Sequence, residues 1–372
     1  MPGRLRAFWE RVSDGIGMRQ LWAQFHADAR ASYQLYSQEV DWTRQEGESA
    51  PRRFWRVAGG LFWAMIMKLS PARRVLLLAA LAFLILQGPN FRFGEVEIQF
   101  PNLSLLSIVA LLALLALELA DRVTLKRDLE IAREIQNWLM PSAPPQVPGV
   151  DIAFATRPAN TVAGDYYDAF FRQERLLLVV ADVAGKSVPA ALLMATLQAS
   201  LRTLAALPGS LVELVRRLNQ YACAQNLGGH RFTTAFLAEL DPVTGCMTYV
   251  NCGHNWPVLW RPSGEVERLE TGGLPLGILP GAAYECGTAT LGAGDLLVIF
   301  TDGLVEAEDA TEQEYGERRF LDVVGGLGGA GAAESLKRIM SAVDAFVGLT
   351  RQHDDITCLV LRRLAAASPV VA

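Results

Sequence analysis

The pattern that decides the fold lies in residues 175–205, RLLLVVADVAGKSVPAALLMATLQASLRTLA. A short apolar run of strand length, 176–181, ends at Asp182, and a tight turn at 185–187 leads into an apolar helical pattern. Further short β patterns follow, TTAFLAEL, CMTYVNC, DLLVIF and DITCLVL, with the turn signals DPVTG and RPSG and with helical stretches near 187–226 and 333–348. Mostly antiparallel strands with clustered helices predict an α+β domain, not a parallel doubly wound sheet.

Four aspartates lie at or near the ends of such apolar runs, where a rigid sheet holds a side chain in place. They are Asp165 in AGDYYD, Asp182 after LLLVVA, Asp302 after LLVIFT and Asp354 before DITCLVL. Carboxylates gathered in a low-dielectric cleft repel one another, so they persist together only if a multivalent cation neutralises them. Oxygen ligands suit Mg²⁺ or Mn²⁺ rather than a soft metal. Each aspartate alone is more typical of a cap or a turn, so the prediction depends on the joint pattern.

Length and composition exclude several classes of protein. A chain of 372 residues predicts more than one folding unit. Hydrophobic residues make up 51% and charged residues 20%, which favours a protein that is part membrane and part soluble. The net charge of −5 argues against nucleic acid as a partner. The five cysteines form no C-x-x-C pair, so they suggest neither a disulfide framework nor a zinc site, and they favour a reducing cytosol.

Residues 1–74 form a basic, aromatic-rich leader, which we expect to be cytoplasmic. They carry twelve Lys and Arg against seven Asp and Glu. Tryptophans among scattered arginines are typical of amphipathic segments on an anionic membrane face, and a small helical or disordered leader is the alternative. The tryptophans are Trp9, Trp22, Trp42, Trp55 and Trp63.

Two uncharged apolar runs follow, at 75–86 and 103–117. The second, with its flanks, reaches the ~20 residues that a bilayer needs, and the first reaches the lower limit of about 17 only if it extends to Phe93. Basic residues flank the outer ends of both runs, so the positive-inside rule predicts a two-helix transmembrane hairpin at 75–120 with both ends cytoplasmic. A pair of buried core helices is the alternative. The flanking residues are Arg73, Arg74, Arg122, Lys126 and Arg127.

Residues 121–141 have the apolar spacing of an amphipathic connector helix, which Pro141 ends. Such a stripe packs on its own domain or on a second copy, so a homodimer through this helix is one hypothesis. The sequence PSAPPQVPG at 141–149 marks a boundary. We therefore expect a catalytic domain at 142–364 and a tail at 365–372.

From the connector onward, the motifs taken in order resemble the bacterial metal-dependent serine/threonine phosphatases of the PPM superfamily, in their SpoIIE-like branch. They span about residues 129–363 and read LEIAREIQNWLMPSAPP, VAGDYYDAF, VVADVAGKSVPAALLMA, FTTAFLAELDPVTGCMTYVNCGHNWPVL, GGLPLGIL, IFTDGLVEAEDATEQEYGERRF and HDDITCLVLR. The resemblance implies an α-β-β-α sandwich with a two-metal site at one edge of the packed sheets. Ser187 stands where the family usually has Gly.

The resemblance also implies a ligand set for two divalent cations, Mn²⁺ or Mg²⁺. Asp182 would bridge both cations and the Val183 carbonyl would help to hold the second. Asp302 and Asp354 would complete the first metal, and Asp165 would lie on the side of the second. Two cations ~3.5–4 Å apart activate a water for in-line attack, so the site needs no protein nucleophile.

Other residues near these motifs have weaker signals. Arg157 in TRPAN and His254 in NCGHN are candidate substrate-binding residues, with a structural loop role as the alternative for His254. Asp355 is interpreted as a strand-start or loop residue and Asp168 as a turn residue or a group behind the ligands. The sequence GKS at 185–187 is not a P-loop, because Val180 occupies the position of the required glycine.

The predicted function is a membrane-tethered, Mg/Mn-dependent protein serine/threonine phosphatase in the cytoplasmic (inner) membrane, with its catalytic domain in the cytosol. The resemblance implies a phosphorylated regulatory protein as substrate, such as an anti-sigma-factor antagonist. One alternative is a catalytically inactive signalling scaffold with a phosphatase fold. The other is a metal-dependent phosphatase of small molecules.

Overall fold

The fold comes from a computed structural model that describes residues 50–85, 91–93, 96–98, 103–225 and 231–365. Most of the predicted leader, with Trp9, Trp22 and Trp42, and nearly all of the predicted tail lie outside these residues. The chain divides into two compact units, Met1–Thr124 and Leu125–Ala372, which we describe separately.

The described part of the first unit is mainly helical. Its elements are α3 (Ala50–Lys68), α4 (Pro71–Ile85), the strands β1 (Phe91–Phe93) and β2 (Val96–Ile98), and the first part of α5 (Ser104–Leu139). Polar contacts join α4 to α5. The buried Ser107 hydroxyl donates to the Ala80 carbonyl at 2.8 Å, and the Arg73 guanidinium lies 2.9 Å from Glu118 and 2.7 Å from Asp121.

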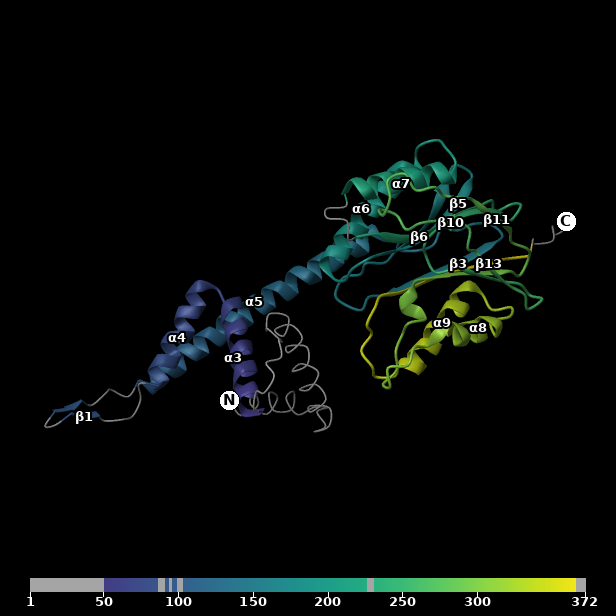
Figure 1. Cartoon of the computed structure of the whole chain (residues 1–372). Helices are drawn as coiled ribbons and strands as arrows, with labels where there is room; N and C mark the ends of the chain where they lie inside the picture. The colour runs from purple at the N-terminus through teal and green to yellow at the C-terminus, as the bar shows by residue number, and fades with distance from the viewer. Residues whose placement is uncertain (1–49, 86–90, 94–95, 99–102, 226–230, 366–372) are drawn as a thin grey trace, which may run out of the picture. The chain divides into compact units, whose positions relative to one another are not determined.

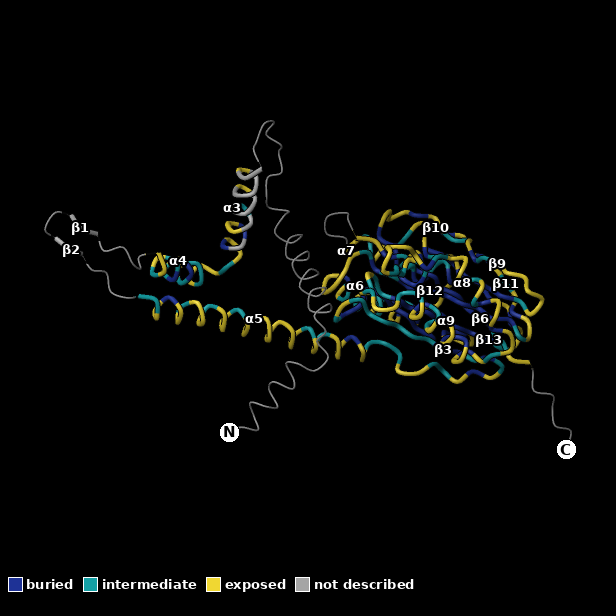
Figure 2. The backbone as a smooth tube through the Cα atoms, turned by 90° about the horizontal axis from the view of Figure 1, so that it is seen from below, coloured by how far each residue is buried: buried dark blue, intermediate teal, exposed yellow. Residues whose placement is uncertain are grey.

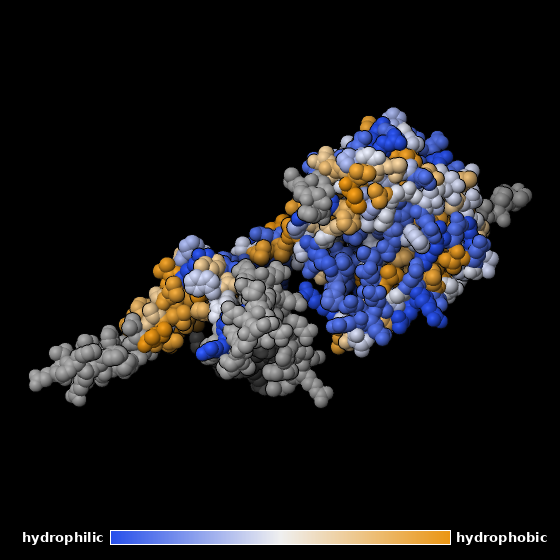
Figure 3. All heavy atoms as spheres, viewed as in Figure 1, coloured by the Kyte–Doolittle hydropathy of each residue, from blue (hydrophilic) through white to orange (hydrophobic). Residues whose placement is uncertain are grey.

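The two apolar runs differ in how well they fit a bilayer. Helix α4 ends at Ile85 and Phe91–Phe93 is a strand, so the extension of the first run to Phe93 as one helix was wrong. Fifteen residues at 1.5 Å each give α4 a length of about 22 Å, short of a ~30 Å hydrocarbon core. Helix α5 is long and apolar enough to span, and only 6% of its apolar window is buried. Figures 2 and 3 show its exposed and apolar surface.

Helix α5 runs without a break from the second apolar run through the predicted connector to Leu139. Helix α6 (Val188–Ala205) also passes the length and hydropathy test for a span. It lies in the folded domain, however, where Ala190, Met194 and Leu201 are fully buried in a core. The predicted hairpin therefore depends on α4 and α5 alone, and the membrane location stays a prediction.

The second unit consists of two packed antiparallel sheets (Figure 1). One sheet has the order β3 (Val150–Arg157), β13 (Ile356–Arg363), β12 (Leu296–Phe300), β8 (Val258–Trp260) and β9 (Val266–Arg268). The other has the order β10 (Gly272–Gly273), β7 (Cys246–Cys252), β6 (Thr233–Leu240), β5 (Arg175–Val183) and β4 (Tyr166–Arg172), with β11 (Gly287–Thr290) on β7. Among the described strands, only the short β10 pairs in parallel.

Helices cover both outer faces of the packed sheets. Helices α6 and α7 (Leu211–Gln225) pack on the sheet that contains β5, and α8 (Gly316–Gly325) and α9 (Ala332–Val347) pack on the sheet that contains β13. A third apolar cluster fills the space between the sheets. The predicted α-β-β-α sandwich is confirmed.

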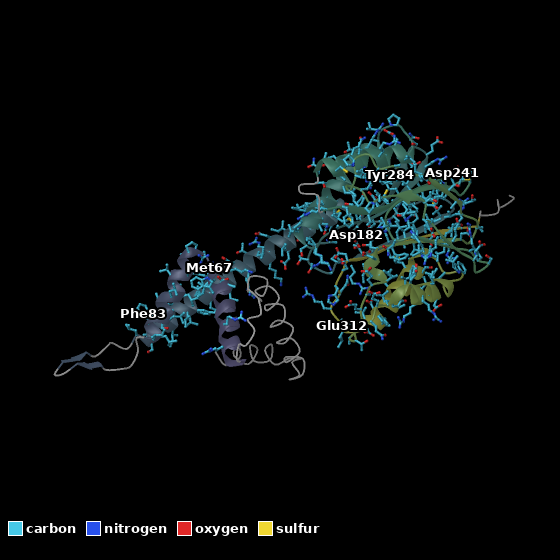
Figure 4. The ribbon with its side chains drawn as sticks, viewed as in Figure 1. Met67, Phe83, Asp182, Asp241, Tyr284 and Glu312 are labelled. Carbon is cyan, nitrogen blue, oxygen red and sulfur yellow. The ribbon has the colours of Figure 1, made fainter. Side chains whose placement is uncertain are left out.

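Strand β5 shows how the sequence produces this arrangement. Its alternate side chains point to opposite faces, so Leu178 and Val180 pack between the sheets while Leu177 and Val179 pack under the helices. A strand buried on both faces needs an unbroken apolar run. After the apolar run, the next polar side chain, Asp182, comes only where the strand reaches the edge of the sandwich (Figure 4).

Candidate functional site

Carboxylates from four separate segments meet at this edge of the sandwich. Asp182 lies close enough to Asp165, which directly precedes β4, and to Asp302, Asp354 and Asp355 to interact with their charges. Asp302 is the first residue of the 3-10 helix η1 (Asp302–Leu304), which follows β12, and Asp354 and Asp355 directly precede β13. The structure therefore brings together all four predicted metal-ligand aspartates.

Glycine at position 303 makes this approach possible. A Cβ atom at Gly303 would lie 2.2 Å from the Asp355 carbonyl oxygen and 3.3 Å from the Asp354 Cβ. Only a residue without a side chain allows the segment after β12 to lie this close to the segment before β13. The TDG motif thus places Asp302 beside Asp354.

Burial and mutual repulsion raise the pKa of the clustered carboxyls. For Asp182 burial is the larger cause, followed by the charges of Asp302 and Asp354, and together they raise its pKa to about 7. Burial and then the charge of Asp182 raise the pKa of Asp165 well above its usual value. The carboxyls of Asp302 and Asp355 shift in the same direction. The cluster therefore favours a cation at neutral pH.

Lys186 supplies one positive charge within the described cluster. Its Nζ atom lies 3.0 Å from Asp354 Oδ2 and donates to the His353 carbonyl at 2.8 Å. Its charge also lowers the pKa of Asp302, against the larger effect of burial. The sequence analysis considered Lys186 only within the GKS sequence that it rejected as a P-loop, and it missed this contact. The position of Lys186 four residues after Asp182 was the one signal that could have indicated a place near the cluster.

The donor set suits a hard divalent cation, since it consists of carboxylate and carbonyl oxygens. No three His, Cys, Asp or Glu side chains in the described part of the chain converge closely enough to hold a metal ion as they stand. The residues therefore fit such a cation by chemistry and charge, and binding requires their side chains to adjust.

Asp355 holds the loop that leads to Asp165. Its carboxylate accepts the N–H groups of Ala159 at 2.7 Å and Gly164 at 2.6 Å. Thr301 fixes the far end of the loop, because its hydroxyl donates to Asp165 Oδ2 at 2.9 Å. Asp355 thus has the loop role that the sequence analysis assigned to it.

Gln136 of α5 holds the same loop from the other side, which sequence reasoning missed. Its Nε2 donates to the Ala163 carbonyl at 2.7 Å, and its Oε1 accepts the Ala163 N–H at 3.0 Å. The Gln136 side chain is buried and Ala163 is only 3% exposed. Two residues after this paired contact the chain reaches Asp165, so α5 helps to position a predicted ligand.

Asp168 lies apart from the cluster, inside the sheet. Its carboxylate accepts two bonds from the Arg202 guanidinium, at 2.8 and 2.7 Å, and one from the Tyr166 hydroxyl. The guanidinium lies 3.9 Å above the Phe170 ring. These contacts fasten α6 to β4, which agrees with a role for Asp168 behind the ligands.

The two predicted substrate-binding residues lie in different places. Arg157 lines a cavity of about 290 Å³ together with Lys186 and Asp354, and its guanidinium pairs with Asp344 of α9. His254 does not line that cavity. It is 4% exposed, and its Nδ1 lies 3.0 Å from the hydroxyl of Thr234, the strand partner of Asp182.

Burial lowers the pKa of His254 to about 4. The imidazole is therefore neutral at pH 7, and it cannot supply a proton as an imidazolium at that pH. Its contact with Thr234 supports the alternative of a structural role in the loop next to the site.

Ser187 has a backbone conformation that favours glycine. Its φ of 66° with ψ of −147° lies in a region that side chains make unfavourable. This residue is the N-cap of α6 and directly follows Lys186, so the strain lies beside the carboxylate cluster. The conformation gives a physical reason for the glycine that the resembled family has at this position.

Comparisons with known proteins agree with the fold. Residues 172–364 match the family described as Stage II sporulation protein E (SpoIIE). Protein IcfG of Synechocystis is 26% identical over 277 residues, which are 67% of this chain and 43% of IcfG. Phosphoserine phosphatase RsbU of Bacillus subtilis is 30% identical over 241 residues, which are 64% of this chain and 71% of RsbU.

A solved structure shows the same likeness. The RsbU and RsbW domains of Rv1364c from Mycobacterium tuberculosis align with a TM-score of 0.54 and 28% identity, over 62% of this chain and 65% of theirs. This chain spans less than half of IcfG and slightly under two thirds of the Rv1364c structure. The family match covers more than half of the chain and confirms the prediction: the chain belongs to the SpoIIE family of PPM-type serine/threonine phosphatases.

Proposed function

We propose that this chain is a metal-dependent protein serine/threonine phosphatase tethered to the cytoplasmic membrane. The observation that carries the proposal is the cluster of carboxylates that β5, β12 and β13 bring to one edge of the sandwich, with pKa values raised by burial and repulsion. Such a cluster needs cations, and the relative RsbU of Bacillus subtilis is named as a phosphoserine phosphatase.

Two cations, Mg²⁺ or Mn²⁺, are held in this proposal by Asp165, Asp182, Asp302, Asp354 and the Val183 carbonyl. When bound, such a pair activates a water and neutralises phosphoryl oxygens. Other residues of the site hold one of these ligands in position. Asp355, Thr301 and Gln136 keep the Asp165 loop in place.

The adjoining cavity offers two cationic side chains to a phosphate ester, among five carboxylates that favour a cation. Lys186 and Arg157 both line it, and each is paired with a carboxylate, of Asp354 and Asp344 respectively. Both side chains are partly exposed, so a phosphoryl group can compete for them. We propose a phosphorylated regulatory protein as the substrate, of the class of anti-sigma-factor antagonists.

The tether and the dimer belong to the same proposal. Helix α5 exposes apolar side chains along its first part, including Leu105, Leu112 and Leu119, as a lipid-facing helix does. Farther along, Leu125, at 60% exposed, and Ile135, at 49%, leave the connector stripe available for a second copy. The catalytic domain lies in the cytosol if both hairpin ends do.

The test is phosphate release by the full-length protein in detergent, with p-nitrophenyl phosphate and a phosphoserine peptide as substrates. We expect manganese-dependent release from both, and loss of at least 100-fold in Asp302→Asn. The control is Asp322→Asn, the same change at an exposed residue of α8 away from the site, and this variant should keep its activity. Full activity in chelator or in Asp302→Asn contradicts the metal mechanism.

The same assay separates the alternatives. Release from neither substrate, with manganese present, indicates the inactive scaffold. Release from the aryl phosphate alone indicates a phosphatase of small molecules. The proposed function requires release from the phosphoserine peptide.

A further inference from the structure

An open cavity of about 530 Å³ lies between the domain end of α5 and the loops that carry the carboxylates. Helix α5 contributes Lys126, Glu130 and Arg133, and the loops contribute Asn160, Ser187 and Arg351 among others. All of these residues belong to the second unit. The cavity is distinct from the one that contains Arg157 and Lys186.

The charged lining of this cavity is mostly basic. Three cations face one carboxylate, in a chain whose net charge is −5. Among the residues that the structure describes, no hydrogen bond or ion pair is found for Arg133 or Arg351. The Lys126 Nζ lies 3.9 Å from Glu130, a distance that makes only a weak, solvent-screened pair. Within the described part of the chain, these two guanidinium groups are thus available to an anionic ligand.

The cavity borders the carboxylate cluster through three segments of chain. Asn160 follows Ala159, whose N–H binds Asp355. Ser187 follows Lys186, whose ammonium binds Asp354. Arg351 precedes Asp354 by three residues, which an extended chain spans in about 10 Å. A substrate segment bound at the cluster can therefore reach this cavity within a few residues.

We infer that this cavity is a docking site for an acidic segment of the substrate protein, next to its phosphorylated residue. The inference rests on the proposed function. Guanidinium groups bind carboxylates through two parallel hydrogen bonds, and charge complementarity of this kind selects a partner and steers its approach. The three short connections to the carboxylate cluster favour a protein segment that also reaches the reaction site.

The experiment compares two phosphoserine peptides in the full-length protein in detergent. One peptide carries four glutamates after the phosphoserine and the other carries glutamines at these positions. We expect kcat/KM to favour the acidic peptide about tenfold at low salt, equivalent to two exposed ion pairs, and we expect this ratio to fall as salt rises. In Arg133→Glu/Arg351→Glu the ratio falls to about 1 or below.

Arg127→Glu is the matched control, since it reverses a charge on the same helix outside the cavity and keeps the preference. A preference that survives in the double variant, or its absence in the wild type, overturns the inference. A third outcome also overturns it. If the double variant keeps the peptide preference and changes only how added phosphatidylserine affects p-nitrophenyl phosphate hydrolysis, the cavity is a membrane contact. No hydrolysis of any substrate, by contrast, overturns the proposed function itself.

Discussion

Removal of the Gln136 amide should loosen the loop that carries Asp165. In Gln136→Leu the buried N–H and C=O of Ala163 both lose their partner. An unpaired buried polar group costs about 1–3 kcal/mol, so the two together cost roughly 2–6 kcal/mol. Part of this cost disappears if water reaches the loop, which places the expected value near the lower end.

The loop retains its contacts with Asp355 and Thr301, so we expect local opening rather than loss of the fold. Amide hydrogen exchange at residues 161–165 should accelerate at least tenfold, which is the effect of 1.4 kcal/mol. Urea unfolding of the full-length protein should show a lower midpoint at an unchanged slope. Manganese titration should show weaker binding, because Asp165 is then less well positioned.

The adjacent Asn137→Leu is the matched control, since it makes the same kind of change on the exposed side of α5. A surface substitution of this kind changes stability by no more than ~0.5 kcal/mol. Equal exchange rates and equal midpoints in the two variants refute the idea that Gln136 positions the loop. Faster exchange with unchanged manganese affinity refutes the link from the loop to Asp165.

Three further predictions follow from single positions. Ser187→Gly should relieve backbone strain and raise the stability by about 1 kcal/mol, measured as a higher urea midpoint; an equal or lower midpoint contradicts the strain at φ 66°. Gly303→Ala should abolish phosphatase activity, because its Cβ would lie 2.2 Å from the Asp355 carbonyl oxygen, and wild-type rates would show that this close approach is not required. His254 has a folded-state pKa of about 4, below the unfolded value of 6.5, so the unfolded state binds the extra proton. Its contribution to stability is complete above pH 6.5 and is lost as pH falls toward 4, by about 1.4 kcal/mol per unit. His254→Gln should lack this component, and identical pH profiles of unfolding would contradict it.

The sequence was sufficient for the parts of the fold that local patterns determine. Strand β5 is apolar on both faces, so its run of six apolar residues identified both the strand and the edge where Asp182 emerges. The glycine in TDG and the position of Asp354 before β13 are likewise local signals. The pairing of the strands brings these segments together. That pairing was expected only because the motifs resemble a known family in their order.

The boundaries of helices were predicted less well, because the amino-acid composition can change along a helix while the backbone stays helical. The sequence analysis divided α5 near residue 120, where an apolar run becomes amphipathic. No glycine or proline occurs between Ser104 and Leu139, however, so nothing interrupts the helix. The opposite error occurred after α4, where Gly88 and Pro89 follow the helix closely and disfavour its extension to Phe93.

The contacts of Gln136 and Lys186 lay beyond sequence reasoning for a different reason. Gln136 meets a backbone group 27 positions away, and Lys186 meets one 167 positions away, so neither contact leaves a periodic trace in the chain. Each side chain is also ordinary for its setting, since a glutamine or a lysine on an amphipathic helix or in a turn is typical of an exposed surface. Only the packed structure distinguishes them from solvated neighbours.

Helix geometry joins the loop contact to the proposed docking cavity. Positions 126, 130, 133 and 136 are spaced three or four apart, so Lys126, Arg133 and Gln136 lie along one side of α5. Arg133 and Gln136 are separated by about 4.5 Å along the helix axis, at 1.5 Å per residue. A rotation or shift of α5 would therefore displace both the guanidinium that lines the cavity and the amide that holds Ala163. Because Asp165 follows that amide contact by two residues, we expect a movement of this helix to alter the proposed docking cavity and the proposed cation site together.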